Sequence, residues 1–430
     1  MPLRRLLGLS AAASAPLRRG FSTAAWRPPW AMMEKFVVVN PQPPLPRTSL
    51  RLAEPPSASR LILPSHLIYT PRGPDPVTGE LSAAFGGFVK AASGDGLLLL
   101  HFFELIGTAA SNVGGARGLK LTGVSMDPDV TRFVCNPLSG ELFRLPEIDG
   151  TKKTMWFSDI GILTQSERPQ RPPDRYAVAC LSEDHDGEEL SFVMRRFLSE
   201  TGKWDKVVGL QSPLPVSRRM DMDTPHEAVA FAGRLWWFDV TWGALSLDPF
   251  SDRPELRFVE LPRDSVTDPM DTEKRGELLK YRRMGVSEGR LRYAEVSQEE
   301  PFVLSSFALD DDGKSWTLEH RIELRRLWPK QDLCKDMPHI AVVDPLKASV
   351  MHLTVGKQES SIDMDTGNLL GCTLRGEDDR PFEFLKPWLL PPWLETSRIP
   401  SAGTRSRNKV NVKSASLSDI LVRVDRDKKI

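Results

Sequence analysis

The chain has 430 residues, of which 40% are hydrophobic, and its 57 Lys and Arg residues balance its 57 Asp and Glu residues. This composition is typical of a globular protein with a full core, and it argues against a disordered or collagen-like class. The longest apolar run, Gly96 to Phe103, is far shorter than the roughly 20 residues that span a bilayer, so we expect no transmembrane segment.

The N-terminal segment is basic and free of acids, since the first Asp or Glu is Glu34. An arginine- and serine-rich, acid-free start is typical of an organellar transit peptide. The run Arg19-Gly20-Phe21-Ser22 resembles the Arg-x-Phe/Ser site of plant mitochondrial processing enzymes, which predicts cleavage between Phe21 and Ser22. We therefore expect residues 1–21 to be a transit peptide and the mature protein to reach the mitochondrial matrix, with a plastid or dual destination as the alternative.

Charge is distributed unevenly along the chain. Between Ser22 and Glu395 there are 44 basic and 54 acidic residues, whereas residues 396–430 carry nine basic and three acidic ones. An acidic body is unlike a nucleic-acid platform, because phosphate binding requires clustered positive charge. We expect residues 396–430 to be a flexible basic tail that makes at most a weak contact with an anionic surface.

Prolines dominate the segment that follows the transit peptide. Their spacing from Arg27 to Pro76 prevents long helices and favours short extended pieces or a linker. We therefore expect residues 22–60 to be a Pro-rich N-terminal segment and residues 61–395 to form the folded domain.

Short apolar runs separated by turn residues follow from Gly94 onward, a pattern typical of an all-β protein. The clearest group runs from Glu227 to Leu261, where four short strands are predicted within about 35 residues, which approaches the propeller repeat of about 40–50. Similar groups follow at 284–324 and 339–374, and strands for two or three more precede them.

These groups predict a β-propeller-like array of about six four-stranded blades. A β-sandwich repeated side by side would also explain the strands. The propeller is favoured because the period continues over some 300 residues and radial closure leaves no long exposed sheet edge.

Several strings also resemble a known family. The segments 233–261, 281–296, 133–146 and 316–319 resemble the plant family called domain of unknown function 1618, which is abundant in grasses. That family is similar to the β-propeller domains attached to F-boxes, and Asn136-Pro137-Leu138-Ser139-Gly140-Glu141 resembles their NPxTGE element. The resemblance implies a propeller-like fold and no established catalytic residues. A transit peptide stands where an F-box would be expected, which argues against a ubiquitin-ligase adaptor.

Two motifs suggest chemistry but fit turns better. Gly285-Val286-Ser287-Glu288-Gly289 matches GxSxG, yet a hydrolase elbow needs a helix after the serine, and Arg290 to Val296 alternates like a strand. Asp310-Asp311-Asp312-Gly313 is acidic enough for calcium, but Ala308 would occupy the first ligand position. We expect a hairpin turn at Ser287 and a tight acidic turn at Asp310.

The remaining candidates are weaker. Asp221, Asp223 and His226 form a small polar cluster that is more typical of a solvated loop than of a metal site. The segment 114–118 lacks the spacing of a phosphate loop. The four cysteines, Cys135, Cys180, Cys334 and Cys372, form no CxxC pair, so neither a disulfide framework nor a zinc site is expected. We expect no catalytic residues, cofactor or metal.

Three tryptophans lie close together at 236, 237 and 242. Consecutive Trp236 and Trp237 point to opposite faces of a strand, and we expect at least one of them to pack between neighbouring blades. The sequence therefore predicts a non-enzymatic mitochondrial propeller-like protein that binds another protein through its loops. The alternatives are an enzyme with a site at the propeller axis and an organellar RNA-associated protein that uses its basic tail.

Overall fold

The computed structural model describes residues 27–40, 49–68, 80–109, 121–122, 129–150, 159–168, 170–184, 190–215, 218, 227–328, 337–374 and 385–401. In these residues the fold is almost entirely β, with one α-helix, α1 (Thr272–Leu278). The expected transit peptide and its Phe21–Ser22 cleavage site lie outside the described residues.

Four sheets each contain four antiparallel strands in chain order, which confirms the predicted blade pattern. The first two sheets are β10 (Ile160–Gln165), β11 (Arg175–Asp184), β12 (Ser191–Leu198) and β13 (Lys203–Gln211), then β14 (Glu227–Phe231), β15 (Arg234–Asp239), β16 (Gly243–Leu247) and β17 (Arg257–Glu260). The other two are β18 (Arg282–Ser287), β19 (Arg290–Val296), β20 (Val303–Leu309) and β21 (Trp316–Glu323), then β22 (His339–Val343), β23 (Val350–Val355), β24 (Gln358–Asp363) and β25 (Asn368–Leu374).

The remaining strands form one ten-stranded sheet that contains two more blades. One consists of β5 (Glu80–Ala92), β6 (Leu98–Ala109), β8 (Asp129–Asn136) and β9 (Glu141–Arg144), with the short β7 (Leu121–Thr122) beside β6. The other consists of β26 (Leu385–Leu389), β1 (Trp30–Glu34), β4 (Ala58–Pro64) and β3 (Ser49–Arg51). Strand β2 (Phe36–Asn40) pairs with both β4 and β5 and so joins the two blades.

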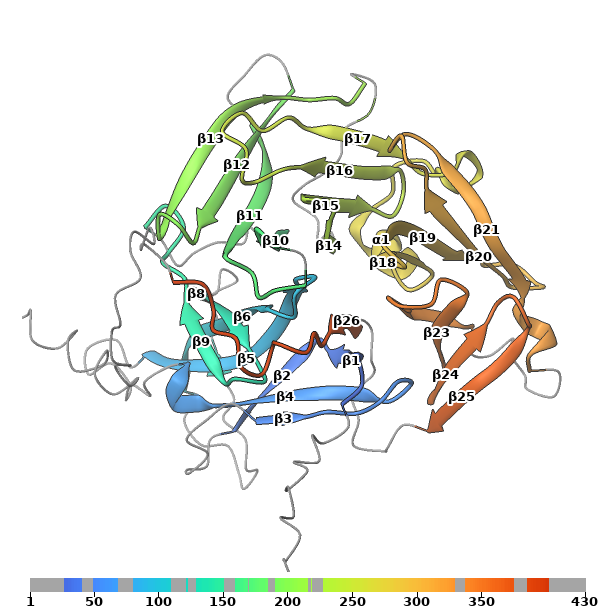
Figure 1. Ribbon diagram of the computed structural model, residues 1–430, viewed down its shortest axis with the longest axis horizontal. Helices are drawn as coiled ribbons and strands as arrows, with labels where there is room; N and C mark the ends of the chain where they lie inside the picture. The colour runs from blue at the N-terminus through green and yellow to red at the C-terminus, as the bar shows by residue number, and fades with distance from the viewer. Residues whose placement is uncertain are drawn as a thin grey trace, which may run out of the picture.

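The innermost strands of the six blades form a closed ring. Each contacts the next, in the order β5, β10, β14, β18, β22 and β26, and β26 contacts β5 again. Figure 1 shows the sheets arranged around a common centre, with β10, β14, β18 and β26 near it. The last strand, β26, pairs antiparallel with the first, β1, so that Trp30 faces Leu389 and Glu34 faces Leu385. Both ends of the folded chain therefore lie in one blade.

The start of the fold differs from the expected boundary at residue 61. Strands β1, β2 and β3 and the first half of β4 lie within the segment expected to be Pro-rich and separate. Between its prolines this segment carries short apolar runs, and Ala31 and Met33 are fully buried in the core. Short strands tolerate prolines at their ends, which explains why this spacing excludes helices without excluding blade strands.

The C-terminal segment stays attached to the fold beyond β26. The amide of the buried Asn136 donates hydrogen bonds to the carbonyl oxygens of Leu394 (2.8 Å) and Ser397 (3.0 Å). Its oxygen accepts from the backbone N–H groups of Leu138 and Ser139 and so caps the β8–β9 turn. The backbone N–H of Ile399 donates to Glu141. The expected flexible tail thus begins no earlier than residue 400, and residues 402–430 lie outside the described part.

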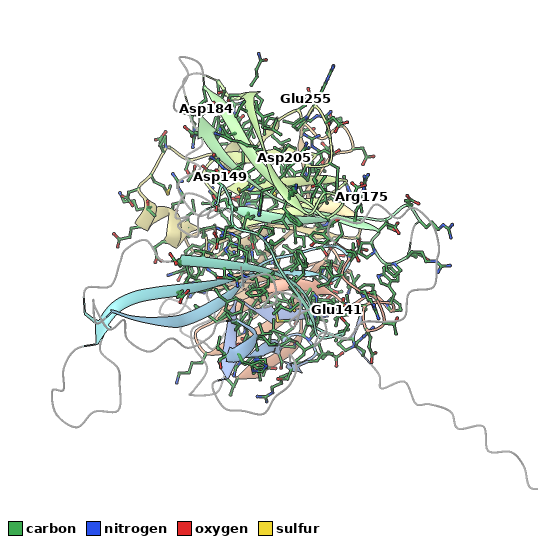
Figure 2. The ribbon with its side chains drawn as sticks, turned by 90° about the vertical axis from the view of Figure 1, so that its left-hand side faces the viewer. Glu141, Asp149, Arg175, Asp184, Asp205 and Glu255 are labelled. Carbon is green, nitrogen blue, oxygen red and sulfur yellow. The ribbon has the colours of Figure 1, made fainter. Side chains whose placement is uncertain are left out.

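The blade that contains β10 to β13 carries charged side chains, among them Arg175, Asp184 and Asp205, which are labelled in Figure 2. Arg196 on β12 pairs with Asp205 on β13 at 2.9 Å, and Arg195 pairs with Asp149 at 2.6 Å. The carboxylates of both pairs are exposed to solvent, whereas Arg196 is buried and also donates to the carbonyl oxygens of Pro249 and Ser251, so it links this blade to the next.

The core lies mainly between neighbouring blades. Trp237 is fully buried with residues of β11 and β12, and its indole N–H donates to the carbonyl oxygen of Asp159 at 2.8 Å. Trp236 is 5% exposed and packs on the opposite face of the sheet, with Met284 and Tyr293 of the next blade. The prediction that at least one of the two tryptophans packs between blades is confirmed, and the structure shows that both do.

We therefore expect Trp236→Ala and Trp237→Ala each to lower the free energy of unfolding by about 3–5 kcal/mol, the usual cost of truncating a buried large aromatic side chain. Denaturant unfolding of the two variants measures this cost. Leu318→Ala is a matched control, because Leu318 is 44% exposed and its truncation should change stability by no more than about 0.5 kcal/mol. An unchanged midpoint in either tryptophan variant would contradict the packing described here.

Candidate binding site at one end of the ring

Charged side chains meet where the innermost strands begin. Glu227 is the first residue of β14, Arg283 the second of β18 and Lys386 the second of β26, while Asp159 immediately precedes β10. Arg283 lies 3.4 Å from Glu227, and Lys386 forms an ion pair with the other carboxylate oxygen of Glu227. Arg283 also donates to the carbonyl oxygen of Ile340, the second residue of β22. These contacts bring the starts of four blades together at one end of the ring, which we call the mouth.

The carboxylate of Glu227 is held in its charged form. Its burial alone would raise its pKa, but the neighbouring Lys386 and Arg283 outweigh this effect and lower the pKa to about 2. The side chain of Glu227 is 12% exposed, that of Lys386 13% and that of Arg283 5%. Glu227 therefore anchors two cations from two other blades in a largely water-free position.

Two more lysines stand beside this group. Burial, followed by repulsion from Lys386, Lys90 and Arg283, lowers the pKa of Lys35 to about 8. Burial also lowers the pKa of Lys90 on β5, which interacts with Asp159 and Glu227. The ammonium group of Lys35 lies 5.8 Å from the centre of the Phe88 ring. Both lysines remain partly exposed.

We call these six residues the cationic rim: Lys35, Lys90, Asp159, Glu227, Arg283 and Lys386. Four cationic side chains face two carboxylates, so the rim is positive within a chain whose body is acidic. Sequence reasoning did not find this site, because each member looks like an ordinary charge at a strand end. The signal available in the sequence was their shared position, since Asp159, Glu227, Arg283 and Lys386 lie at or next to the start of the innermost strand in four of the six blades.

Ser287 lies at the end of a strand within a two-residue hairpin, as expected. Glu288 and Gly289 both have positive φ, 49° and 73°, the conformation that tight hairpins require, and β19 follows at Arg290. Ser287 is fully buried, and no described residue accepts a hydrogen bond from its hydroxyl group. A serine nucleophile needs a neighbouring base and an open approach, and Ser287 has neither in the described structure.

A different serine takes part in a hydrogen-bonded chain within one blade. The Ser361 hydroxyl lies 2.8 Å from Nδ1 of His352, and Nε2 of His352 lies 3.3 Å from Asp344. All three side chains are buried, and the Trp30 ring packs edge-on against His352. Asp344 also caps the backbone N–H groups of Leu346 and Lys347. The arrangement resembles a catalytic triad in its residue types, but its burial favours a structural link between β22, β23 and β24.

The acidic run at Asp310 forms the expected tight turn between β20 and β21. The carboxylate of Asp310 accepts hydrogen bonds from the hydroxyl groups of Ser315 and Thr317, and Gly313 adopts a positive φ of 68°. The described residues contain no group of three or more His, Cys, Asp or Glu side chains that could hold a metal. The predicted cluster of Asp221, Asp223 and His226 lies outside them, as do the segment 114–118 and Cys334.

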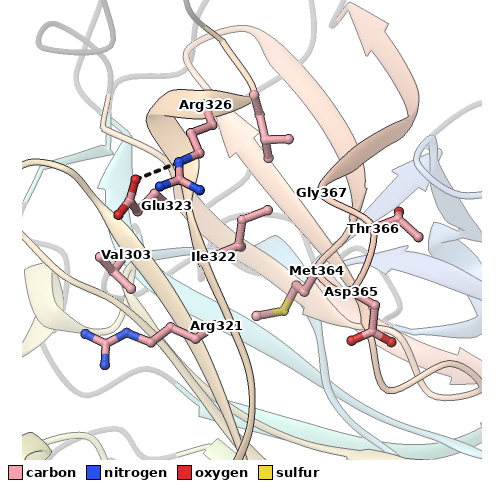
Figure 3. Close-up of a pocket in the computed structure, with 10 residues that line it drawn as sticks. Val303, Arg321, Ile322, Glu323, Arg326, Met364, Asp365, Thr366 and Gly367 are labelled. Carbon is pink, nitrogen blue, oxygen red and sulfur yellow. Dashed lines mark ion pairs between the residues drawn. The ribbon is translucent and has the colours of Figure 1, made fainter.

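A groove with a volume of about 660 Å³ lies between β21 and the β24–β25 turn. Figure 3 shows Arg321 on one wall and Asp365 on the other, with Ile322 and Met364 between them. Asp365 is already held by His320 at 2.7 Å, and Arg326 pairs with Glu323 at 2.8 Å. The charges of this groove are largely paired locally, in contrast with the excess of cations at the rim.

No helix in the described residues is long and apolar enough to cross a membrane.

We expect neither Ser287 nor Ser361 to react as a nucleophile, because both hydroxyl groups are buried. Labelling of the purified protein with a fluorophosphonate probe checks this. Labelling that disappears in Ser287→Ala would restore the hydrolase interpretation of GxSxG, whereas labelling that disappears in Ser361→Ala would assign a nucleophile to the His352 chain.

The ion pairs of Glu227 should make stability depend on pH in the acid range. Because the folded-state pKa is about 2 and the ordinary value is 4.5, this stabilisation is complete above about pH 4.5 and is lost as the pH falls towards 2. We expect Glu227→Gln to be less stable than the wild type at pH 7, with a difference that shrinks below pH 4.5. Urea unfolding across this range measures it, and Glu255→Gln, at an exposed carboxylate, is the control. A difference independent of pH would contradict the assignment.

Comparison with known proteins supplies no activity for this chain. The chain matches no curated protein. The β-propeller domain of Cps50 (Swd1) from Myceliophteria thermophila is 9% identical, covering 70% of this chain and 84% of that one with a TM-score of 0.31. Apo AztD from Citrobacter koseri is 9% identical, covering 73% and 94% with a TM-score of 0.29. These low scores carry no functional information, and the blade architecture rests on the strand pairing itself.

A match to a family model covers the middle of the ring. Residues 237–355, from within β15 to the end of β23, match the family described as Protein of unknown function (DUF1618). The expected resemblance is thereby confirmed over the two blades that gave its clearest strings. Over residues 237–355 this chain is therefore similar to the DUF1618 family.

Proposed function

We propose that this chain is a mitochondrial, non-enzymatic binding protein that holds an acidic segment of a protein partner at the cationic rim. The observation that carries this proposal is the gathering of four cationic side chains, Lys35, Lys90, Arg283 and Lys386, around the carboxylates of Glu227 and Asp159. The residues come from different blades and depend on the closed ring for their meeting. The acid-free N-terminal segment supports the mitochondrial location.

Electrostatics favour an anion at this position. Repulsion among the cations contributes to the lowered pKa of Lys35, and a bound carboxylate would relieve that repulsion and favour the protonated lysine. The acidic body disfavours a long polyanion such as RNA, which would lie across negative surface as well as the rim. A short acidic peptide segment needs only the mouth and leaves the rest of its chain free to contact the loops.

A fluorescent hexaglutamate peptide tests the rim directly. We expect the double variant Lys90→Gln, Lys386→Gln to bind it about tenfold or more weakly, which corresponds to at least about 1.4 kcal/mol. Glu227→Gln should bind it more tightly than the wild type, because it removes a competing carboxylate. Lys314→Gln, at an exposed turn, is the matched control and should leave affinity unchanged.

Binding should also weaken as the pH rises through about 8, because Lys35 then loses its charge. Anisotropy titrations of the variants and of the wild type from pH 6.5 to 9.5 give all these values. Equal affinities in the wild type and the lysine double variant would exclude the rim as the binding site.

We expect residues 1–40 fused to a fluorescent protein to enter mitochondria and to be cleaved near Phe21, because the segment is basic, acid-free and ends at a processing sequence. Imaging of the fusion, with N-terminal sequencing of the imported product, checks both points. A fusion with Arg4, Arg5, Arg18 and Arg19 changed to Gln is the control and should stay in the cytosol. A cytosolic or plastid-only signal from the unchanged fusion would contradict the expected destination.

One observation favours a second candidate, an enzyme that acts on an anionic substrate at the axis. The mouth is charged rather than filled with apolar side chains, and Lys35, with a pKa of about 8, is a group that could accept a proton or form an imine with a carbonyl substrate. Borohydride trapping with pyruvate as the probe distinguishes this candidate. Stable modification of Lys35, absent in Lys35→Arg, would support the enzyme over the binding protein.

A further inference from the structure

The outermost strands of the blades differ in charge. Each of β3, β9, β13, β17 and β21 carries at least one charged residue, including Arg51, Glu141, Asp205, Arg257 and Glu319. Strand β25, with the sequence NLLGCTL, carries none. Charges on edge strands prevent pairing with other chains, and β25 lacks this form of protection, although its pairing with β24 is irregular at Leu370.

Strand β25 also exposes apolar side chains. Leu369 is 42% exposed, Leu370 54% and Leu374 76%, which makes three large hydrophobic residues exposed within seven positions. In the described part of the chain, β25 pairs only with β24, through partners such as Glu359↔Thr373 and Ser360↔Cys372. Its inner-facing residues contact the neighbouring blade, where Ser57 and Thr373 hydroxyl groups lie 3.4 Å apart. The strand is thus fixed in place while its outer edge lacks a described partner strand.

We infer that β25 is a self-association edge, which pairs antiparallel with β25 of a second copy of this chain. A two-fold pair places each residue opposite a residue of the same strand, and on the charged outer strands it would take charged side chains out of water and restrict the register to those that match opposite charges. The uncharged β25 carries no such penalty. Its lack of charge equally removes any attraction for an acidic or basic segment of another protein.

One register best satisfies the exposed side chains. If the two-fold axis passes beside Cys372, then Leu370 of one copy faces Leu374 of the other at both ends of the pair. Residues 372 and 374 lie on one face of the strand, and Leu370, the extra residue at the irregularity before Gly371, is exposed next to them, so this register brings apolar side chains together across the two copies. Cys372 is an exposed free thiol and would face its own counterpart. Directly opposite residues at the closer, non-hydrogen-bonded positions of antiparallel pairs have Cβ atoms about 4.5 Å apart, the upper end of the range that a disulfide spans.

A single seven-residue strand provides a small contact, so we expect a reversible dimer that dissociates on dilution. Sedimentation velocity of the mature protein over a series of concentrations should show a monomer–dimer equilibrium. The double variant Leu370→Lys, Leu374→Lys introduces like charges at the facing positions and should be monomeric throughout the series. Leu318→Lys, an exposed leucine on the charged strand β21, is the matched control and should dimerise as the wild type does.

Oxidation with copper phenanthroline tests the register without altering the edge. The wild type should yield a disulfide-linked dimer whose cross-linked peptide joins Cys372 to Cys372, and Cys372→Ser should yield none. A monomer at every concentration, a dimer unaffected by the two lysines, or a cross-link through another cysteine would each overturn the inference. These outcomes are independent of peptide binding at the rim, because β25 is the outermost strand of its blade and the rim surrounds the axis.

Discussion

The pairing of β26 with β1 is the constraint on which the rest of the structure depends. A ring of blades has two loose ends, and this chain joins them by placing its last described strand innermost in a blade whose other strands come from its beginning. Trp388 on β26 is fully buried and donates to the carbonyl oxygen of Gly96, which ties the closing blade to the next one. The Asn136 side chain then holds the chain beyond β26 against the same neighbour. Closure therefore uses backbone pairing, a buried indole and a buried amide together.

The closed ring explains both where the core lies and why charge gathers at one mouth. Because the main sheet faces are covered by neighbouring blades, Trp236 and Trp237 are buried on opposite sides of one strand. Because the innermost strands begin at the same end of the ring, charged residues at their first positions meet there. Glu227 compensates two of the four cations directly. The cationic rim therefore forms only when the ring of blades closes, and the sequence of a single strand does not predict it.

Much of the fold could be predicted from the alternation of short apolar runs and turns. The strands from Glu227 to Leu261 are found nearly where the pattern placed them, and the Ser287 and Asp310 turns have the expected form. Strands β1 to β4 were missed because frequent prolines conceal short runs such as Trp30 to Met33. The rim was missed for another reason. A charge at a strand end is normally solvated, and only the three-dimensional ring brings Lys35, Glu227 and Lys386 together.

Deletion of β26 tests most directly whether this strand closes the ring. Two truncated versions of the chain are compared by urea unfolding, one ending at Ser401 and the other ending at Leu374, before β26. If β26 closes the ring, the chain ending at Ser401 keeps the wild-type midpoint. The chain ending at Leu374 then loses cooperative unfolding and exposes Trp236 and Trp237 to solvent. The same midpoint and cooperativity in both chains would contradict the claim that β26 closes the ring.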